Sequence, residues 1–597
     1  MRKATLQVLL ALSLFYSPVA AQAATEQKSA MKALLDELYI RFNDHYAPLH
    51  WKKTNYGFDL DLKRSQLTEQ IDTGISVEQY HQQLKGLISA TQDYHVNIHF
   101  ASTGSSVLPF TLAKVGTEYV ISYIDRSHLP PPRFPFSIGD KVTSLGGEPV
   151  ANIVEKLYAD LTVNREKTDD ALRALSITMR RGTKALPLPK GPVLVIGENT
   201  LGKELSAEVI WIHESNSMEY LPVTSKPEGF TTAMSNFGFS PLQLPMDLAI
   251  ASKDPAKVWN MIRHNMKRDY SFHHNLGLQK RVSAGEVPQE NRLSIPQFIG
   301  DRRGFTPKLN GKIVWQSDPK GEFFAYITEN INRERTGFLR LHSYVTTSGV
   351  SATQAASQLR AIMKIMNNNA DVLVIDQTSN PGGSLFYLYA IASMLTDKPL
   401  QTPKERVALD SGMVWDAHRQ IKGLDSLLAL LNMLGVGFSE DIDGYKLDLQ
   451  GLYFLREYYR FIIEQWKEGK TLTDPYHIYG TDSIIPDAEV NFTKPVLLLV
   501  NELDFSCADF FPAIMQDNSR MTLMGENTAG AGGYVLSYGL QNNLGVLGYS
   551  MTGSIAIRPN GNPIENLGVT PDIAYSLDYQ DFKNGFLPYQ EAIMQQV

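Results

Sequence analysis

Two stretches among the first hundred residues carry apolar side chains three and four positions apart. Residues 30–42 and 77–88 both have this spacing, which places the apolar side chains on one face of a helix. Residues 93–100 instead alternate between polar and apolar side chains, and this period of two predicts a strand with its polar residues on one face. The pattern therefore predicts an N-terminal helical segment over residues 24–104 that ends in a strand.

Residues 105–220 consist of short β-forming runs. Residues 136–150 predict two strands joined by a Gly-Gly turn, and a helix is expected to follow over residues 152–161. The run Gly-Asp-Lys-Val, followed by Gly-Gly-Glu-Pro-Val, resembles the PDZ module, which binds peptide termini by adding them to its sheet. An ordinary β-hairpin is the alternative interpretation of these residues.

Residues 301–597 have the pattern of an α/β domain. Continuous apolar runs at 371–376 and 494–500 predict strands that are buried on both faces, as in a parallel sheet. Residues 352–367 predict a helix that precedes the first of these strands. The chain is therefore expected to be a multidomain α/β protein.

Two stretches interrupt this organisation. Residues 404–490 separate the two buried strands and contain two helical patterns. Residues 221–300 lie between the β-rich and α/β parts; residues 224–248 mix aromatic, proline and small residues, whereas 255–270 predicts one amphipathic helix. We interpret both stretches as insertions, although a longer interdomain linker would explain residues 221–300 equally well.

Composition narrows the range of functions. The chain of 597 residues has 43% hydrophobic and 20% charged residues, which is typical of a soluble protein with several domains. Its net charge of −7 offers no broad basic surface to a nucleic acid. Cys507 is the single cysteine, which excludes an intramolecular disulfide and a thiolate zinc site. The pair His273-His274 has no third ligand at a suitable spacing, so we expect neither a metal nor another cofactor.

The first residues have the pattern of a secretory signal. Arg2 and Lys3 precede an apolar stretch at residues 6–15, and Ala21-Gln22-Ala23 supplies the small-x-small cleavage pattern. The apolar stretch is too short to span a bilayer, and no later stretch is long and apolar enough. We therefore expect residues 1–23 to be removed and the protein to be exported, to the periplasm or beyond.

Ser506 lies where the apolar strand 494–500 gives way to a predicted helix. At such a junction the first free N–H groups of the helix and its dipole face any oxyanion that develops on a bound substrate. Taken alone, a serine at this place is more often a helix N-cap than a nucleophile. The surrounding motifs favour the interpretation of Ser506 as a nucleophile.

Three separated segments resemble the tail-specific, or C-terminal processing, protease family, which shares its crotonase-like fold with tricorn protease. Residues 374–384 resemble the family's strand and Asn-Pro-Gly-Gly loop, 494–530 its nucleophile segment, and 564–573 its closing Gly-Val-x-Pro-Asp motif. The resemblance implies a serine protease in which the nucleophile lies three residues before an acidic residue. Asp509 then identifies Ser506.

The family's usual base, a lysine 25 residues after the serine, is replaced here by Ala531. Tricorn-like members instead use a histidine from the N-terminal region together with a glutamate of the closing segment. The resemblance implies His95, in Asp93-Tyr94-His95, as the base and Glu565 as its partner. His99 is the rival base, since on a strand it would share a face with His95.

The turn at Asn380-Pro381-Gly382-Gly383 follows a buried strand, and its glycines let the backbone approach a substrate carbonyl closely. We predict that the N–H of Gly382 or Gly383, together with the N–H of Cys507, binds the oxyanion. A plain tight turn is the alternative.

The order of segments resembles the chlamydial protease-like activity factor branch of this family. That resemblance implies a homodimer that acts on proteins or peptides, and a self-inhibited precursor activated by internal cleavage, for which residues 221–300 are the candidate segment. The alternatives are an inactive ligand- or peptide-binding protein on the same fold and a PDZ-based scaffold.

Overall fold

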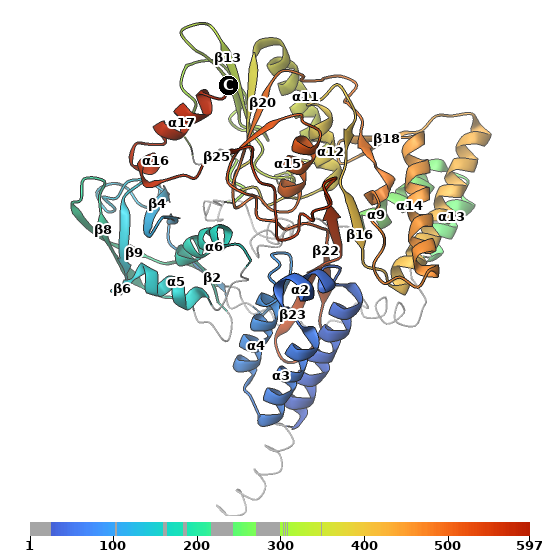
Figure 1. The fold of residues 1–597 in the computed structure, drawn as a ribbon, viewed down its shortest axis with the longest axis horizontal. Coiled ribbons are helices and arrows are strands. Elements are labelled where there is room, and N and C mark those ends of the chain that lie inside the picture. Colours follow the sequence, from blue (N-terminus) through green and yellow to red (C-terminus); the bar gives the residue numbers. More distant parts are fainter. Residues whose placement is uncertain are drawn as a thin grey trace, which may run out of the picture.

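The computed structural model describes residues 25–101, 104–158, 164–182, 188–215, 243–269, 299–302, 304, 306, 308–347 and 349–597. Residues 1–23 and the pair His273-His274 lie outside these ranges. Figure 1 shows an α/β body at the top, a β-rich domain on one side, helices on the other and the N-terminal helices below. Within the described residues, no helix combines the length and the apolar character needed to cross a bilayer.

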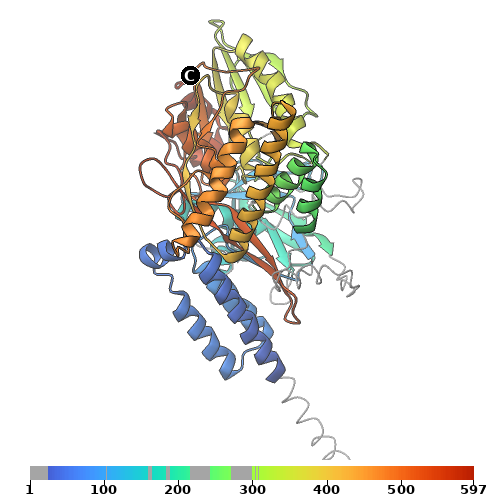
Figure 2. The ribbon, with the colours of Figure 1, turned by 90° about the vertical axis from the view of Figure 1, so that its right-hand side faces the viewer.

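The N-terminal segment is helical, as predicted, and projects from the rest of the molecule (Figure 2). Its core contains Phe42, Ile71 and Leu84, and it also includes Tyr549 and Met551 from near the C-terminal end of the chain. The segment is therefore packed against the α/β body rather than tethered to it. Its helices span residues 25–45, Leu49–Tyr56 (α2), Leu60–Thr73 (α3) and Val77–Ser89 (α4).

Strand β1 (Asn97–Phe100) joins this segment to the α/β body. It pairs antiparallel with β23 (Val546–Thr552), which also pairs with β22 (Val535–Gly539). Asn97 lies opposite Ser550, and His99 lies opposite Gly548. The pairing fixes the position of residues just before β1 relative to the closing segment.

The predicted strand over residues 93–100 is correct only in its second half. Residues 93–96 form a turn, in which the N–H of His95 donates to Oδ1 of Asp93 (2.9 Å) and the N–H of Val96 to the Asp93 carbonyl (3.1 Å). A side chain that satisfies backbone donors locally competes with strand pairing. His95 and His99 therefore do not share a strand face, and this prediction was wrong.

The β-rich domain contains the predicted hairpin. β5 (Lys141–Leu145) and β6 (Glu148–Pro149) are joined by two glycines with φ of 64° and 81°, as a two-residue hairpin turn requires. The main sheet has the order β3-β4-β5-β8-β9, with helices packed against it. The other elements are β2 (Gly104–Val107), β3 (Phe110–Val115), β4 (Glu118–Ile124), α5 (Val150–Tyr158), α6 (Glu166–Thr178), β7 (Met179–Gly182), β8 (Pro192–Glu198), β9 (Glu204–Ile210) and β10 (Ile212–Ser215).

The α/β body is built on a sheet of seven strands in the order β11-β12-β13-β14-β20-β21-β25. The five strands from β13 to β25 run parallel, whereas β11 and β12 extend one edge in antiparallel fashion. The strands are β11 (Lys312–Gln316), β12 (Ala325–Glu329), β13 (Arg335–Arg340), β14 (Val372–Asp376), β20 (Val496–Val500), β21 (Thr522–Gly525) and β25 (Ile573–Ala574).

Both faces of this sheet are covered, which explains the continuous apolar runs in its central strands. On one face, Ile375 and Leu498 pack in a core with α11 (Ala352–Asn369), α12 (Leu385–Ser393) and α15 (Cys507–Asp517). On the other, Val374 and Leu499 pack with side chains of α17 (Leu587–Met594). Shorter elements complete the body: β15 (Leu400–Gln401), β16 (Lys404–Val407), η2 (Ile478–Gly480), β19 (Ser483–Ile484), β24 (Ser554–Ile557) and α16 (Tyr579–Lys583).

The two insertions meet in the helical layer. The second contributes α13 (Ser411–Leu434), the hairpin β17 (Ser439–Ile442) and β18 (Tyr445–Asp448), and α14 (Leu449–Lys467). The first contributes α8 (Gln243–Ala251) and α9 (Pro255–Asp269), whose buried Trp259 and Ile262 belong to the same core. Residues 243–269 are therefore not a linker. Residues 216–242 and 270–298 lie outside the described ranges.

We expect Asp93→Ala to destabilise the junction between the N-terminal segment and the α/β body. The buried Asp93 carboxylate accepts hydrogen bonds from the N–H of His95 (2.9 Å), the hydroxyl of Tyr46 (2.9 Å) and the hydroxyl of Thr552 (2.8 Å). Leaving these buried donors without an acceptor should lower the free energy of unfolding by about 3 kcal/mol. A lower urea midpoint, followed by intrinsic fluorescence, would show the loss.

Asp93→Asn is the matched control, because its amide oxygen still accepts from His95 and both hydroxyls can turn to donate elsewhere or accept. It should lose much less stability. An alanine variant with the wild-type midpoint would contradict the role given to Asp93.

Candidate active site

Ser506 lies between β20 and α15, and its backbone is strained. Its φ of 59° and ψ of −118° are values that residues other than glycine rarely adopt, and such strain clusters at functional turns. The side chain is buried, and within the described residues its Oγ has no hydrogen-bond partner. An N-cap serine would accept a bond from the first helical turn. The hydroxyl of Ser506 is therefore not used as a cap.

The carboxylate of Asp509 holds the turn that carries Ser506. It accepts the N–H of Ser506 (2.9 Å), the hydroxyl of Thr528 (2.5 Å) and the N–H groups of Gly530 (2.8 Å) and Ala531 (3.0 Å). Burial raises the pKa of Asp509 to about 6, and these donors oppose that rise. The acidic residue three positions after the serine thus ties the serine turn to the segment around Ala531.

Sequence neighbours of His95 and Ser506 are in contact. The rings of Tyr94 and Phe505 pack edge to face with centroids 5.5 Å apart, and both belong to a small core that also contains Ala531. The structure therefore brings the turn of His95 next to the turn of Ser506. Ala531, which occupies the position of the family's lysine, lies in the same small core and cannot act as a base.

The Asn380-Pro381-Gly382-Gly383 turn lies directly against the serine. A Cβ added to Gly382 would come within 2.7 Å of Cβ of Ser506, so only glycine allows this approach. The N–H of Gly382 donates to Oδ1 of Asn380 (2.8 Å). Within the described residues, the N–H groups of Gly383 and Cys507 have no acceptor, which favours Gly383 over Gly382. The thiol of Cys507 donates to the Gly383 carbonyl (3.2 Å). The oxyanion site itself stays a prediction.

His95 is buried and its backbone is fixed at both ends. Its N–H is held by Asp93, and its carbonyl accepts the hydroxyl of Ser550 on β23 (2.8 Å). Burial lowers the pKa of His95 to about 4; Asp93 opposes this and Lys52 adds to it. A neutral imidazole is therefore the stable form at neutral pH, as a general base requires. His99 lies on β1, which begins two residues after His95, and is only partly buried.

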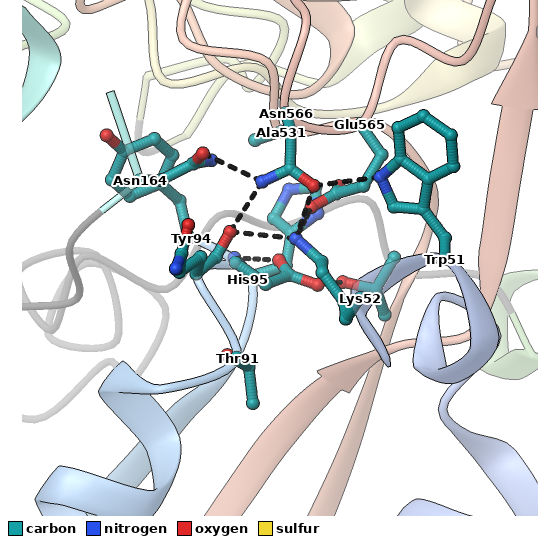
Figure 3. A network of polar contacts seen from close by, with 12 residues as sticks. Trp51, Lys52, Thr91, Tyr94, His95, Asn164, Ala531, Glu565 and Asn566 are labelled. Atoms are coloured by element: carbon teal, nitrogen blue, oxygen red, sulfur yellow. Dashed lines mark hydrogen bonds and ion pairs between the residues drawn. The ribbon is translucent and has the colours of Figure 1, made fainter. Parts of the chain in front are cut away.

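Glu565 lies in the same buried cluster (Figure 3). Its Oε1 forms an ion pair with Nζ of Lys52 at 2.5 Å, whereas Oε2 has no hydrogen-bond partner within the described residues. Burial and, next, Asp93 raise the pKa of Glu565 to about 8, and Lys52 opposes the rise. The carboxyl group thus has one oxygen fixed and one oxygen open.

Lys52, on α2, is a member of this cluster that sequence reasoning missed. Its ammonium donates to Oε1 of Glu565, to the Gln92 carbonyl (2.7 Å) and to Oδ1 of Asn566 (2.7 Å). Trp51 also donates to that Asn566 oxygen from its indole nitrogen (3.1 Å). The N-terminal segment therefore supplies both a histidine and a lysine to the cluster.

No signal in the sequence separates Lys52 from its neighbour. Lys53 pairs with Asp59 at 3.0 Å and has a side chain 54% exposed, whereas the Lys52 side chain is 0% exposed. Both lysines sit in one short helix without strong amphipathic patterning, so only the packing of α2 against the closing segment distinguishes them.

The β-rich domain also contacts the cluster. Asn566 donates from Nδ2 to Oδ1 of Asn164 (2.7 Å), and the hydroxyl of Tyr94 donates to Asp169 on α6 (2.8 Å). Figure 3 shows Asn164, Tyr94 and Asn566 side by side around the cluster. Residues from three parts of the chain therefore meet at one point.

Comparison with known proteins agrees with this organisation. The sequence model of peptidase family S41 matches residues 335–575, and that of a PDZ domain matches 104–222. A Chlamydia pneumoniae protein is 30% identical over 99% of this chain and 94% of its own length. A Chlamydia muridarum protein is 29% identical over 99% of this chain and 96% of its own length.

Solved structures show the same similarity. The crystal structure of mature CPAF superposes with a TM-score of 0.73 at 26% identity, covering 95% of this chain and 96% of that one. Mature CPAF complexed with lactacystin superposes with a TM-score of 0.72 at the same identity. The predicted multidomain α/β fold with a PDZ domain is thereby confirmed. Similarity along the full length, together with the match over the α/β body, shows that the chain belongs to peptidase family S41 and is a serine peptidase.

Proposed function

We propose that this peptidase is an exported endopeptidase that cleaves proteins with Ser506 as nucleophile, His95 as base and Glu565 as the partner of the base. The observation that carries the proposal is the state of Ser506. Its backbone is strained, and its buried hydroxyl has no hydrogen-bond partner in the described residues. The serine turn also packs against the turn that holds His95. The open oxygen of Glu565 supplies the acceptor that a catalytic imidazole needs.

In this reaction Oγ of Ser506 attacks the substrate carbonyl carbon while His95 takes the hydroxyl proton. The carbonyl oxygen becomes an oxyanion, which in this proposal is bound by the N–H groups of Gly383 and Cys507; neither has an acceptor within the described residues. When the tetrahedral intermediate collapses, the C–N bond breaks and His95 returns the proton to the leaving amine. Water then attacks the acyl-enzyme by the same route, with Glu565 stabilising the imidazolium in both halves.

We further propose that the uncleaved chain is latent. Ser506, His95 and Glu565 are each 1% exposed or less, so a peptide cannot reach them without a rearrangement. Internal cleavage within residues 221–300, in a homodimer, is the rearrangement that the family resemblance suggests. The related crystal structures are of mature CPAF, which is consistent with a processing step.

An inactive binding protein on the same fold is the competing function. It would have no use for an uncapped nucleophile turn together with a buried histidine and glutamate. A fluorophosphonate probe, which reacts only with an activated serine, separates the two.

We expect Ser506→Ala to abolish fluorophosphonate labelling and to lower peptide hydrolysis by about 10³-fold or more. Its folding should be unchanged, because Oγ makes no hydrogen bond in the described residues. Ser351→Ala is the matched control: Ser351 caps α11 through its own hydroxyl, so its loss should affect stability slightly and activity little. Wild-type hydrolysis by the Ser506 variant would end the proposal.

We expect His95→Ala and Glu565→Ala each to lower kcat severely, whereas His99→Ala should be mild. His95 and Glu565 lie in the buried cluster, and His99 is partly exposed on β1. Steady-state kinetics would measure this on variants that have been cleaved in trans by tagged wild-type protein, which is then removed. A fully active His95 variant would move the base to another residue.

We expect purified precursor to cleave itself at sites outside 243–269, because α8 and α9 are packed in the core. The cuts should fall in residues 221–242 or 270–298, and hydrolysis of an added peptide should rise as they appear. Gel time courses with mass-mapped fragments would follow both, at several protein concentrations. Faster cleavage at higher concentration supports a dimer, and Ser506→Ala protein should stay whole. Full activity from an intact wild-type chain would remove the latency.

A further inference from the structure

Lys52 is a lysine whose charge is enclosed entirely by protein. Its side chain is 0% exposed, and its three donors are all used, by Oε1 of Glu565, the Gln92 carbonyl and Oδ1 of Asn566. Three acceptors around one nitrogen match an ammonium, since a neutral amine has only two N–H groups. A buried cation of this kind persists only where it is paired and fully hydrogen-bonded.

The two neutral partners of Lys52 have unusual backbones. Gln92 has φ of 50° and Asn566 has φ of 65°, both in the left-handed region that side chains disfavour. Gln92 lies three residues before His95, and Asn566 directly follows Glu565. Lys52 therefore bonds the strained turn in front of the histidine and the strained turn behind the glutamate at the same time.

We propose that Lys52 is a positioning residue for catalysis, which stabilises the carboxylate form of Glu565 and leaves Oε2 as the acceptor for the ring N–H of His95. The inference rests on the proposed Ser-His-Glu site and adds to it a fourth residue, Lys52, which lies on α2. Lys52 acts through Glu565 and does not touch the substrate.

The charge of Lys52 is needed because the other charged groups that shift the pKa of Glu565 are acids. Arg165 is also close, but its guanidinium donates to the Asn566 carbonyl (3.1 Å) and forms no ion pair with Glu565. Asp93 lies in the turn before β1 and Asp509 on α15, and both raise the pKa of Glu565, as burial does; Lys52 lowers it. With Lys52 in place the pKa of Glu565 is about 8; without Lys52 it would be higher, and the carboxylate would form only in more alkaline solution. A protonated Oε2 would donate to the imidazole instead of accepting from it, and the ring would then present the wrong tautomer to Ser506.

The sign of the pH effect follows from this. In Lys52→Met the folded-state pKa of Glu565 rises further, so its carboxylate forms only at higher pH. We expect kcat at pH 7 to fall at least tenfold, the acid limb of the kcat profile to move up by one pH unit or more, and most of the rate to return at the alkaline end. KM should change little.

Lys53→Met is the matched control, since it removes an exposed lysine one position away and should leave the profile unchanged. Lys52→Gln serves if the methionine variant fails to fold, because its amide still donates two hydrogen bonds without a charge. Lys52→Met/Glu565→Gln should lack the acid limb set by Glu565, as Glu565→Gln alone does. Its remaining limb, set by His95, should move up only slightly, because Lys52 also lowers the pKa of His95.

A Lys52 variant whose rate falls equally at every pH would overturn the inference and leave a purely structural role. A double variant whose acid limb still moves by one pH unit or more relative to Glu565→Gln alone would also overturn it, because Lys52 would then set the pH profile without the glutamate. If Glu565→Gln itself keeps full activity, the proposed Ser-His-Glu site is wrong, whatever the Lys52 variants do. This single variant therefore distinguishes failure of the proposed function from failure of the role given to Lys52.

Discussion

A buried ion pair between Lys52 and Glu565 joins the N-terminal helices to the closing segment of the chain. Removing two charges from water is costly, and their attraction repays the cost only when the remaining donors and acceptors are also satisfied. Here Gln92, Asn566 and Trp51 complete the network around the ammonium. Breaking one half of such a pair typically costs about 3–5 kcal/mol, so the contact between the two segments is strongly specified.

The chemistry of the site follows from how little water reaches it. Burial alone pushes His95 toward the neutral form and Glu565 toward the protonated form. A neutral His95 suits its proposed role as a proton acceptor. A protonated Glu565 does not suit the role of its partner, so the effect of burial on Glu565 has to be opposed by a nearby positive charge. The same low exposure leaves the side chains of Ser506, His95 and Glu565 buried.

Much of the fold could be predicted because local patterns determine it. The apolar runs ending at Asp376 and Val500 correspond to β14 and β20, and Ser506, the candidate nucleophile identified by its distance from Asp509, lies just before α15. The strand through residues 93–96 was wrong because the Asp93 side chain bonds the backbone there, which alternation alone does not reveal. Lys52 and the packing of α9 were missed for another reason: both depend on contacts with segments hundreds of residues away.

The antiparallel pairing of β1 with β23 has a consequence for a growing chain. The hydroxyl of Ser550 reaches the carbonyl of His95 across a sequence separation of 455 residues. A ribosome-bound polypeptide that stops short of residue 546 therefore has its serine turn but lacks β23, which pairs with β1 and holds the His95 carbonyl. Contacts over such a sequence distance also form slowly in folding. The cluster around His95 and Glu565 therefore cannot be complete until nearly the whole chain has been synthesised.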